Sequence, residues 1–213
     1  MADATKAEAG PADAGPADAM MLKPAFRLTG RLVATLRTAD PADFRTHAVE
    51  SLPLAGGGIE GDRHFGFTRR SGGREPWYPR GTEIANPRSL TVLSAEELAE
   101  TAAALGLPGL DAAWYGANLV VEGVANLSWL PRGTRIAFAG GASMLVCDQN
   151  APCRITGRAI AEATDRPDVE LAFPRVARRL RGLIGWVDRP GTVAAGEGFT
   201  AFVPEQWVYA PPR

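Results

Sequence analysis

Short apolar stretches separated by glycine-rich turns constrain the fold of this chain most. Residues 134–149, TRIAFAGGASMLVCDQ, are apolar on both sides of Gly140-Gly141 and predict a β-hairpin. Further short strands are predicted at residues 31–38, 47–54, 89–94, 118–123, 183–188, 192–196 and 199–203. Because strands and helices do not alternate regularly, a doubly wound nucleotide-binding fold is disfavoured. The pattern predicts a mainly β (α+β) fold, either a barrel or a curled mixed sheet.

Few segments favour helices. Residues 94–106 form the clearest one, with Ser94 as N-cap, Glu97 completing a capping box and Gly106 as the stop. Residues 153–164 predict a short helix despite Gly157, and residues 169–182 predict a partly helical segment broken near Pro174.

The first residues differ in composition from the rest of the chain. Residues 1–22 are dominated by Ala, Asp, Pro and Gly and contain GPADA twice, so they predict a disordered low-complexity tail. Residues 23–213 are long enough for one domain with a full hydrophobic core, and we expect a single domain there.

Charge and composition exclude several classes of function. The net charge of −1 disfavours a protein dedicated to nucleic-acid binding, and no apolar run is long enough for a membrane helix. The acidic N-terminus lacks the apolar core of a secretory signal, so we expect a cytoplasmic protein with reduced thiols. No lysine follows Lys23, so no pyridoxal phosphate is expected in the folded part.

The two cysteines, Cys147 and Cys153, lie in different settings. Their spacing matches no zinc pattern, and Cys147 lies within an apolar strand, which favours a packing role. Cys153 follows Asn150 and Pro152, a plausible helix start with Asn as N-cap. A thiol there, beside Arg154, has a lowered pKa and can act as a nucleophile or soft metal ligand. The alternative is an incidental surface thiol.

Other polar motifs leave two interpretations open. The stretch GDRHFG places Asp62, Arg63 and His64 between glycines, where a capped turn is favoured over a ligand site. The preceding GGGIEG matches a dinucleotide-binding pattern formally, but no helical pattern follows it. The arginines before residue 183 form either a solvated basic face or an anion site that includes Arg181.

Taken in order, these pieces resemble the MOSC family, named for the C-terminal domain of molybdenum cofactor sulfurase. The resemblance covers roughly residues 50 to 203. Its segments are GIEGDRHFG, LTVLSAEEL, GANLVVEGV, LPRGTRIAFAGGASMLVC, APCRI and RGLIGWVDRPGTVAAGEGF. It implies a β-barrel with a few peripheral helices. One position departs from the family pattern, since Ala117 precedes Asn118 where the family often has Glu.

The resemblance also implies chemistry. Cys153 matches the family's cysteine, which carries sulfur as a persulfide or ligates molybdenum of the pterin cofactor. Arg63, His64, Asn118, Arg154 and Arg181 are then expected to contact the molybdenum cofactor. The first hypothesis is reduction of N-oxygenated small molecules, with electrons from an external donor protein. The second is a sulfur carrier whose Cys153 persulfide, loaded by an external donor protein, delivers sulfur to a cofactor or metabolite. The third is a noncatalytic binding module.

Overall fold

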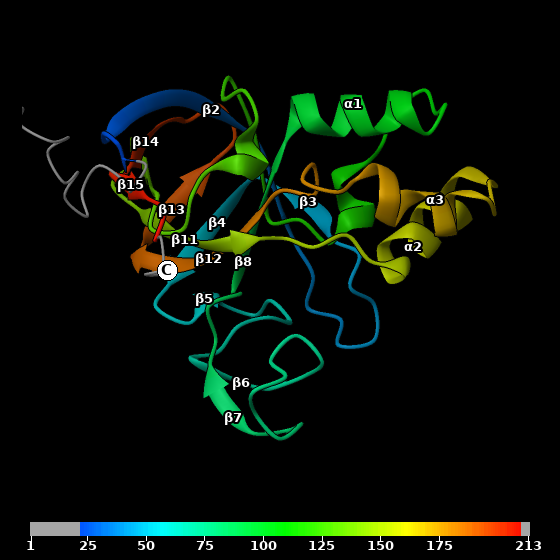
Figure 1. The fold of residues 1–213 in the computed structure, drawn as a ribbon, viewed down its shortest axis with the longest axis horizontal. Coiled ribbons are helices and arrows are strands. Elements are labelled where there is room, and N and C mark those ends of the chain that lie inside the picture. Colours follow the sequence, from blue (N-terminus) through cyan, green and yellow to red (C-terminus); the bar gives the residue numbers. More distant parts are fainter. Residues whose placement is uncertain (1–21, 210–213) are drawn as a thin grey trace, which may run out of the picture.

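A closed β-barrel forms the body of the computed structural model, which describes residues 22–209 (Figure 1). The barrel runs in the order β14–β10–β11–β12–β8–β9–β2 and closes because β2 also pairs with β14. All of these neighbours are antiparallel except β8 and β9. The barrel strands are β2 (Phe26–Arg37), β8 (Leu90–Ser94), β9 (Leu119–Glu122), β10 (Arg135–Phe138), β11 (Ser143–Gln149), β12 (Leu183–Arg189) and β14 (Gly198–Val203). The expected barrel is therefore confirmed.

Short strands extend this body. The remaining strands are β1 (Leu22–Lys23), β3 (His47–Val49), β4 (Ser51–Ala55), β5 (Gly58–Ile59), β6 (Thr68–Arg70), β7 (Glu83–Ala85), β13 (Gly191–Ala194) and β15 (Gln206–Trp207). The β6–β7 hairpin projects away from the barrel (Figure 1). The sequence pattern missed this hairpin because its strands are only three residues each, too short to show an apolar alternation.

The helices lie on one side of the barrel (Figure 1). They are α1 (Ala95–Ala104), α2 (Arg154–Thr164) and α3 (Val169–Val176), with 3₁₀ turns η1 (Ala112–Tyr115) and η2 (Leu127–Trp129). Ser94 caps α1 as predicted, accepting from the Glu97 amide. The Glu97 carboxylate, however, accepts from the backbone and hydroxyl of Ser128, so the predicted capping box is only half formed.

Pro174 does not break α3, contrary to the sequence expectation. A proline at this position cannot donate to the carbonyl of Glu170, four residues earlier. That carbonyl instead faces α2, where a Cβ on Gly157 would lie only 2.5 Å from its oxygen. Gly157 thus permits the close approach of the two helices, which explains a glycine within α2.

Two apolar clusters stabilise this arrangement. One fills the barrel and includes Val92 and Val121, while the other packs the helices against its outside and includes Leu93 and Val120. Strands β8 and β9 therefore bury both faces, as expected of a parallel pair covered by helices.

The predicted tail lies outside the described residues except for Leu22. That residue belongs to β1, which pairs with β15. The single domain expected at residues 23–213 stays a prediction. Within residues 22–209, no helix has the length and apolar character needed to cross a membrane.

Candidate functional site

A cavity of about 650 Å³ lies where the barrel meets the start of α2 and the β6–β7 hairpin. Cys153, Thr156 and Arg181 line it from the α2 side, and the sequence-predicted Arg63 and His64 line it from the loop after β5. Arg69, Arg74 and Arg88 complete a strongly basic wall. No carboxylate is among the described residues that line this cavity.

Cys153 is the residue immediately before α2. Its backbone is extended and its carbonyl accepts from the Gly157 amide, so Cys153 itself is the N-cap. Asn150 was expected in that role. Its backbone N–H instead donates to the Gly182 carbonyl, so Asn150 is paired like a strand residue and lies before the helix. The thiol therefore lies even closer to the positive end of the helix than the sequence implied.

The surroundings of Cys153 favour its thiolate. Burial acts to raise the pKa of Cys153, but hydrogen bonds from Thr156 and the charge of Arg181 outweigh it, so the pKa is lowered. The Sγ of Cys153 lies 3.6 Å from the Oγ1 of Thr156. For Cys147, burial and Asp148 instead raise the pKa. Both thiols are free and half-buried, so Cys147 is less enclosed than a packing role predicts.

Arg181 is a buried cation with unused donors. Its side chain lies over the Tyr115 ring, and its Nη2 donates to the Tyr115 carbonyl over 2.7 Å. Its Nε and Nη1 are buried and have no hydrogen-bond partner among the described residues. Burial lowers the pKa of Arg181 to about 10. Guanidinium groups left in this state fit a cavity that receives an anion.

The other predicted arginines divide between roles. Arg154 does not face Cys153; it forms an ion pair with Glu170 over 2.7 Å, and Arg158 joins the same carboxylate. Because Glu170 on α3 binds both guanidinium groups, Arg154 does not line the cavity, although it is next to Cys153 in the sequence. Arg179 stacks on Trp129, which leaves Arg181 alone of this basic stretch in the cavity wall.

Asp62, His64 and Asn118 form a hydrogen-bonded chain beside the cavity. The fully buried carboxylate of Asp62 accepts from the amides of Thr38 and His64, and lies 3.1 Å from His64 Nδ1. These hydrogen bonds outweigh burial and lower the pKa of Asp62, so it remains ionised and His64 Nδ1 donates to it. The capped turn predicted for this motif is therefore present.

Asn118 does not line the cavity. Its Nδ2 donates to Asp62 and to the Leu36 carbonyl, both over 3.4 Å, and its Oδ1 accepts from the Thr91 amide. Ala117, at the position where the family often has Glu, is fully buried in the apolar cluster beneath the helices.

Sequence reasoning missed Thr156, Arg74 and Arg88 as cavity residues. Thr156 was detectable in principle, because a hydroxyl three residues after a helix N-cap returns toward it. Arg74 and Arg88 were not, because the hairpin that brings Arg74 to the barrel has no clear sequence pattern.

Comparison with known proteins agrees with this architecture. The family model of the MOSC domain matches residues 68–200. A Bacillus subtilis (strain 168) protein described as "Putative metal-sulfur cluster biosynthesis proteins YuaD" is 41% identical over 163 residues, covering 76% of this chain and 85% of that protein. The chain therefore belongs to the MOSC family.

Solved structures show the same fold. The crystal structure of the YuaD protein from Bacillus subtilis superposes with a TM-score of 0.81 at 37% identity, covering 84% of this chain and 98% of that chain. YiiM from Escherichia coli superposes with a TM-score of 0.51 at 19% identity, covering 80% of this chain and 69% of that chain.

Proposed function

We propose that this protein binds the molybdenum cofactor with Cys153 as the metal's protein ligand and reduces N-oxygenated small molecules. One observation carries the proposal: a thiol with a lowered pKa shares its cavity with Arg181, a buried cation whose Nε and Nη1 are unpaired. Family membership agrees with it, because MOSC domains are associated with this cofactor.

The residues present fit the cofactor. Its phosphate-bearing pterin is anionic, and the cavity offers cations with no lining carboxylate to repel it. Cys153 would hold molybdenum as a soft thiolate ligand, and Arg181, Arg63 and His64 would hold the anionic pterin. Asn118 would act indirectly by orienting Asp62, and Arg154 would act only through its ion pair at the start of α2.

When bound, molybdenum would supply the two-electron oxygen-transfer chemistry. The protein would supply protons and position. Converting an N–OH group to N–H and water takes two electrons, from an external donor protein, and two protons. Because Nδ1 of His64 is held by Asp62, Nε2 is the ring nitrogen left to face a ligand. His64 is thus the titratable cavity residue best held for proton delivery.

Metal and pterin analysis tests the proposal. Protein made in a host that synthesises the cofactor should contain molybdenum and pterin in equal amounts, and Cys153→Ser should lose most of the metal. Cys147→Ser is the matched control and should keep it. Reduction of an amidoxime by a chemical donor should follow metal content. Metal-free wild-type protein, from a host that loads a known molybdenum enzyme, would contradict the proposal.

A sulfur-carrier role is the second candidate, and it is favoured by the similarity to YuaD, which is described as a putative metal-sulfur cluster biosynthesis protein. The Cys153 thiolate would attack the outer sulfur of a donor persulfide. A new S–S bond forms on Cys153, the donor's S–S bond breaks, and the donor leaves as a thiolate, so no external oxidant is needed. Mass spectrometry after incubation with a persulfide donor should show one added sulfur on Cys153 and none on Cys147.

If the protein binds neither metal nor sulfur, the third hypothesis, a noncatalytic binding module, is the one left.

A further inference from the structure

Arg74 and Arg88 form a part of the cavity that the proposed function does not use. Both line the cavity, and neither has an ion-pair partner among residues 22–209. Their neighbour Arg69 differs, because Glu75 pairs with it. Glu75 also accepts from the Gly72 amide, so this ion pair shapes the loop that carries Arg74. The loop therefore holds Arg74 toward the cavity with its charge uncompensated.

The unpaired arginines lie close enough to repel one another. Burial, together with the charges of Arg74 and Arg69, lowers the pKa of Arg88 to about 10. Arg74 and Arg88 in turn lower the pKa of Arg181. Like charges brought together in a partly desolvated cavity cost free energy unless an anion enters. The arrangement thus favours a ligand with more than one negative charge.

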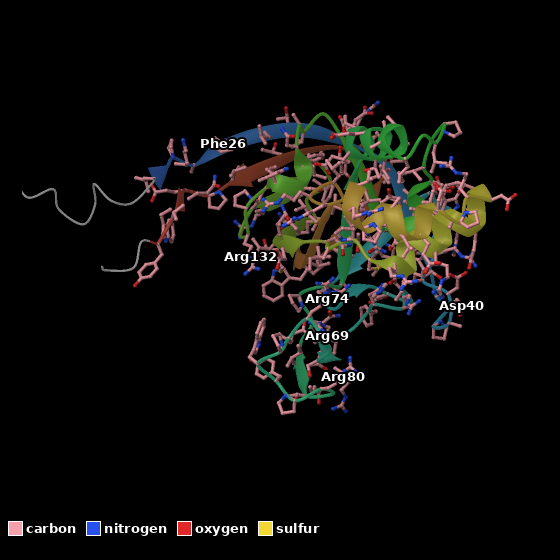
Figure 2. All side chains as sticks on the ribbon, turned by 45° about the vertical axis from the view of Figure 1, so that its right-hand side comes forward. Phe26, Asp40, Arg69, Arg74, Arg80 and Arg132 are labelled. Carbon is pink, nitrogen blue, oxygen red and sulfur yellow. The ribbon has the colours of Figure 1, made fainter. Side chains whose placement is uncertain are left out.

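The arginines also differ in depth. Arg181 is buried, Arg88 is half-buried, and Arg74 is exposed. Figure 2 shows Arg74 where the hairpin meets the body of the protein, with Arg80 farther out along the hairpin. A resident cofactor held by Cys153 and Arg181 would occupy the enclosed end of this cavity. A ligand that enters and leaves meets the exposed end first.

We propose that Arg74 and Arg88 form a second anion subsite, at the mouth of the cavity, that binds the phosphate group of a phosphorylated substrate. A phosphate dianion presents several acceptor oxygens, so two guanidinium groups can each form paired hydrogen bonds with it. The subsite itself stands on the geometry of the arginines. Its assignment to a substrate rests on the proposed function.

Calorimetric titration of the full-length protein with pyrophosphate tests the subsite. Wild-type protein should bind pyrophosphate, more weakly as salt increases. Arg74→Gln and Arg88→Gln should each weaken binding about tenfold, the loss expected for one charge-assisted contact of about 1.4 kcal/mol. Arg80→Gln is the control, because Arg80 lies on the same hairpin but does not line the cavity. Thermal melting should show that all three variants remain folded.

Each outcome decides between explanations. Equal binding by wild type, Arg74→Gln and Arg88→Gln, or no binding at all, overturns the subsite. Loss of pyrophosphate binding on loading with the molybdenum cofactor overturns the substrate assignment, since the arginines would then hold the cofactor's own phosphate. Persistent binding in cofactor-loaded protein supports it. If the protein takes up no cofactor but binds pyrophosphate through Arg74 and Arg88, the subsite stands and the proposed function fails.

Discussion

The hydroxyl oxygen of Thr156 lies 3.6 Å from the sulfur of Cys153, across the first turn of α2. Thr156 is buried, and its hydroxyl also lies 3.5 Å from Nη2 of Arg181. The threonine therefore connects the thiol to the buried guanidinium. When the thiol is ionised, the hydroxyl must donate to sulfur, which leaves its lone pairs to accept from the arginine.

Replacing Thr156 should change the acidity of Cys153. Thr156→Val removes the side-chain donor while keeping the shape, so the pKa of Cys153 should rise and its alkylation at neutral pH should slow. Thr156→Ser keeps the hydroxyl and should stay near wild type. The pH dependence of the iodoacetamide rate measures both. An unchanged profile in Thr156→Val would show that this hydroxyl does not stabilise the thiolate.

The two cysteines should differ in reactivity despite similar burial. The pKa of Cys153 is lowered and that of Cys147 is raised, so only Cys153 should have an appreciable thiolate fraction at neutral pH. Peptide mass spectrometry after brief alkylation should find Cys153 modified first. The difference between the alkylation rates of Cys153 and Cys147 should become smaller as pH rises. Preferential labelling of Cys147 would remove the basis for assigning chemistry to Cys153.

Arg181 should lower the stability of the folded protein when no anionic ligand is bound. A buried cation with two unpaired nitrogens costs stability, so Arg181→Met should raise the free energy of unfolding by about 1 kcal/mol. For a chain of this size the melting temperature should rise by about 2–4 °C. The same variant should retain less pterin than wild type. A lower melting temperature with unchanged pterin content would make Arg181 a purely structural residue.

The barrel was predictable from sequence because short apolar segments and glycine turns act locally. The hairpin at Gly140-Gly141 illustrates this, with Gly141 at a φ of 96° and its amide bonded to the Phe138 carbonyl. The predictions failed where a residue distant in sequence binds the side chain concerned. The Glu97 carboxylate accepts a hydrogen bond from Ser128 instead of closing the capping box, and Arg154 forms an ion pair with Glu170 instead of lying beside Cys153.

The candidate site was predictable only in part for the same reason. Cys153 was predictable because neighbouring residues in the sequence indicate the start of a helix there. Arg181 came from the same local reasoning, but its burial and its unpaired nitrogens depend on Tyr115, far away in sequence. The contribution of Arg74 depends on the hairpin. Long-range packing thus determined which arginines reached the cavity.

Asp62 should make the protein sensitive to acid. Its folded-state pKa is lowered, so its stabilising effect is present above the unfolded value of about 3.9 and is lost as pH falls through the folded value. Asp62→Asn should cost about 1–3 kcal/mol at pH 7. The difference from wild type should shrink in urea unfolding below about pH 4. Asp40→Asn, at an exposed carboxylate, is the control and should change stability little. A constant difference at all pH values would contradict this assignment.

Gly157 should be needed for the packing of α2 against α3. A Cβ at this position would lie 2.5 Å from the Glu170 carbonyl oxygen and 3.2 Å from its carbonyl carbon, so the helices must separate to accept it. Gly157→Ala should therefore destabilise the protein by about 1–3 kcal/mol, although alanine is the better helix former. Because Cys153 is the N-cap of α2, the shift should also alter the alkylation rate of that thiol. Gly109→Ala is the control, since a Cβ there meets no atom within 4 Å. Urea unfolding of both variants measures the effect, and equal stability of the two would show that the helices can separate at no cost.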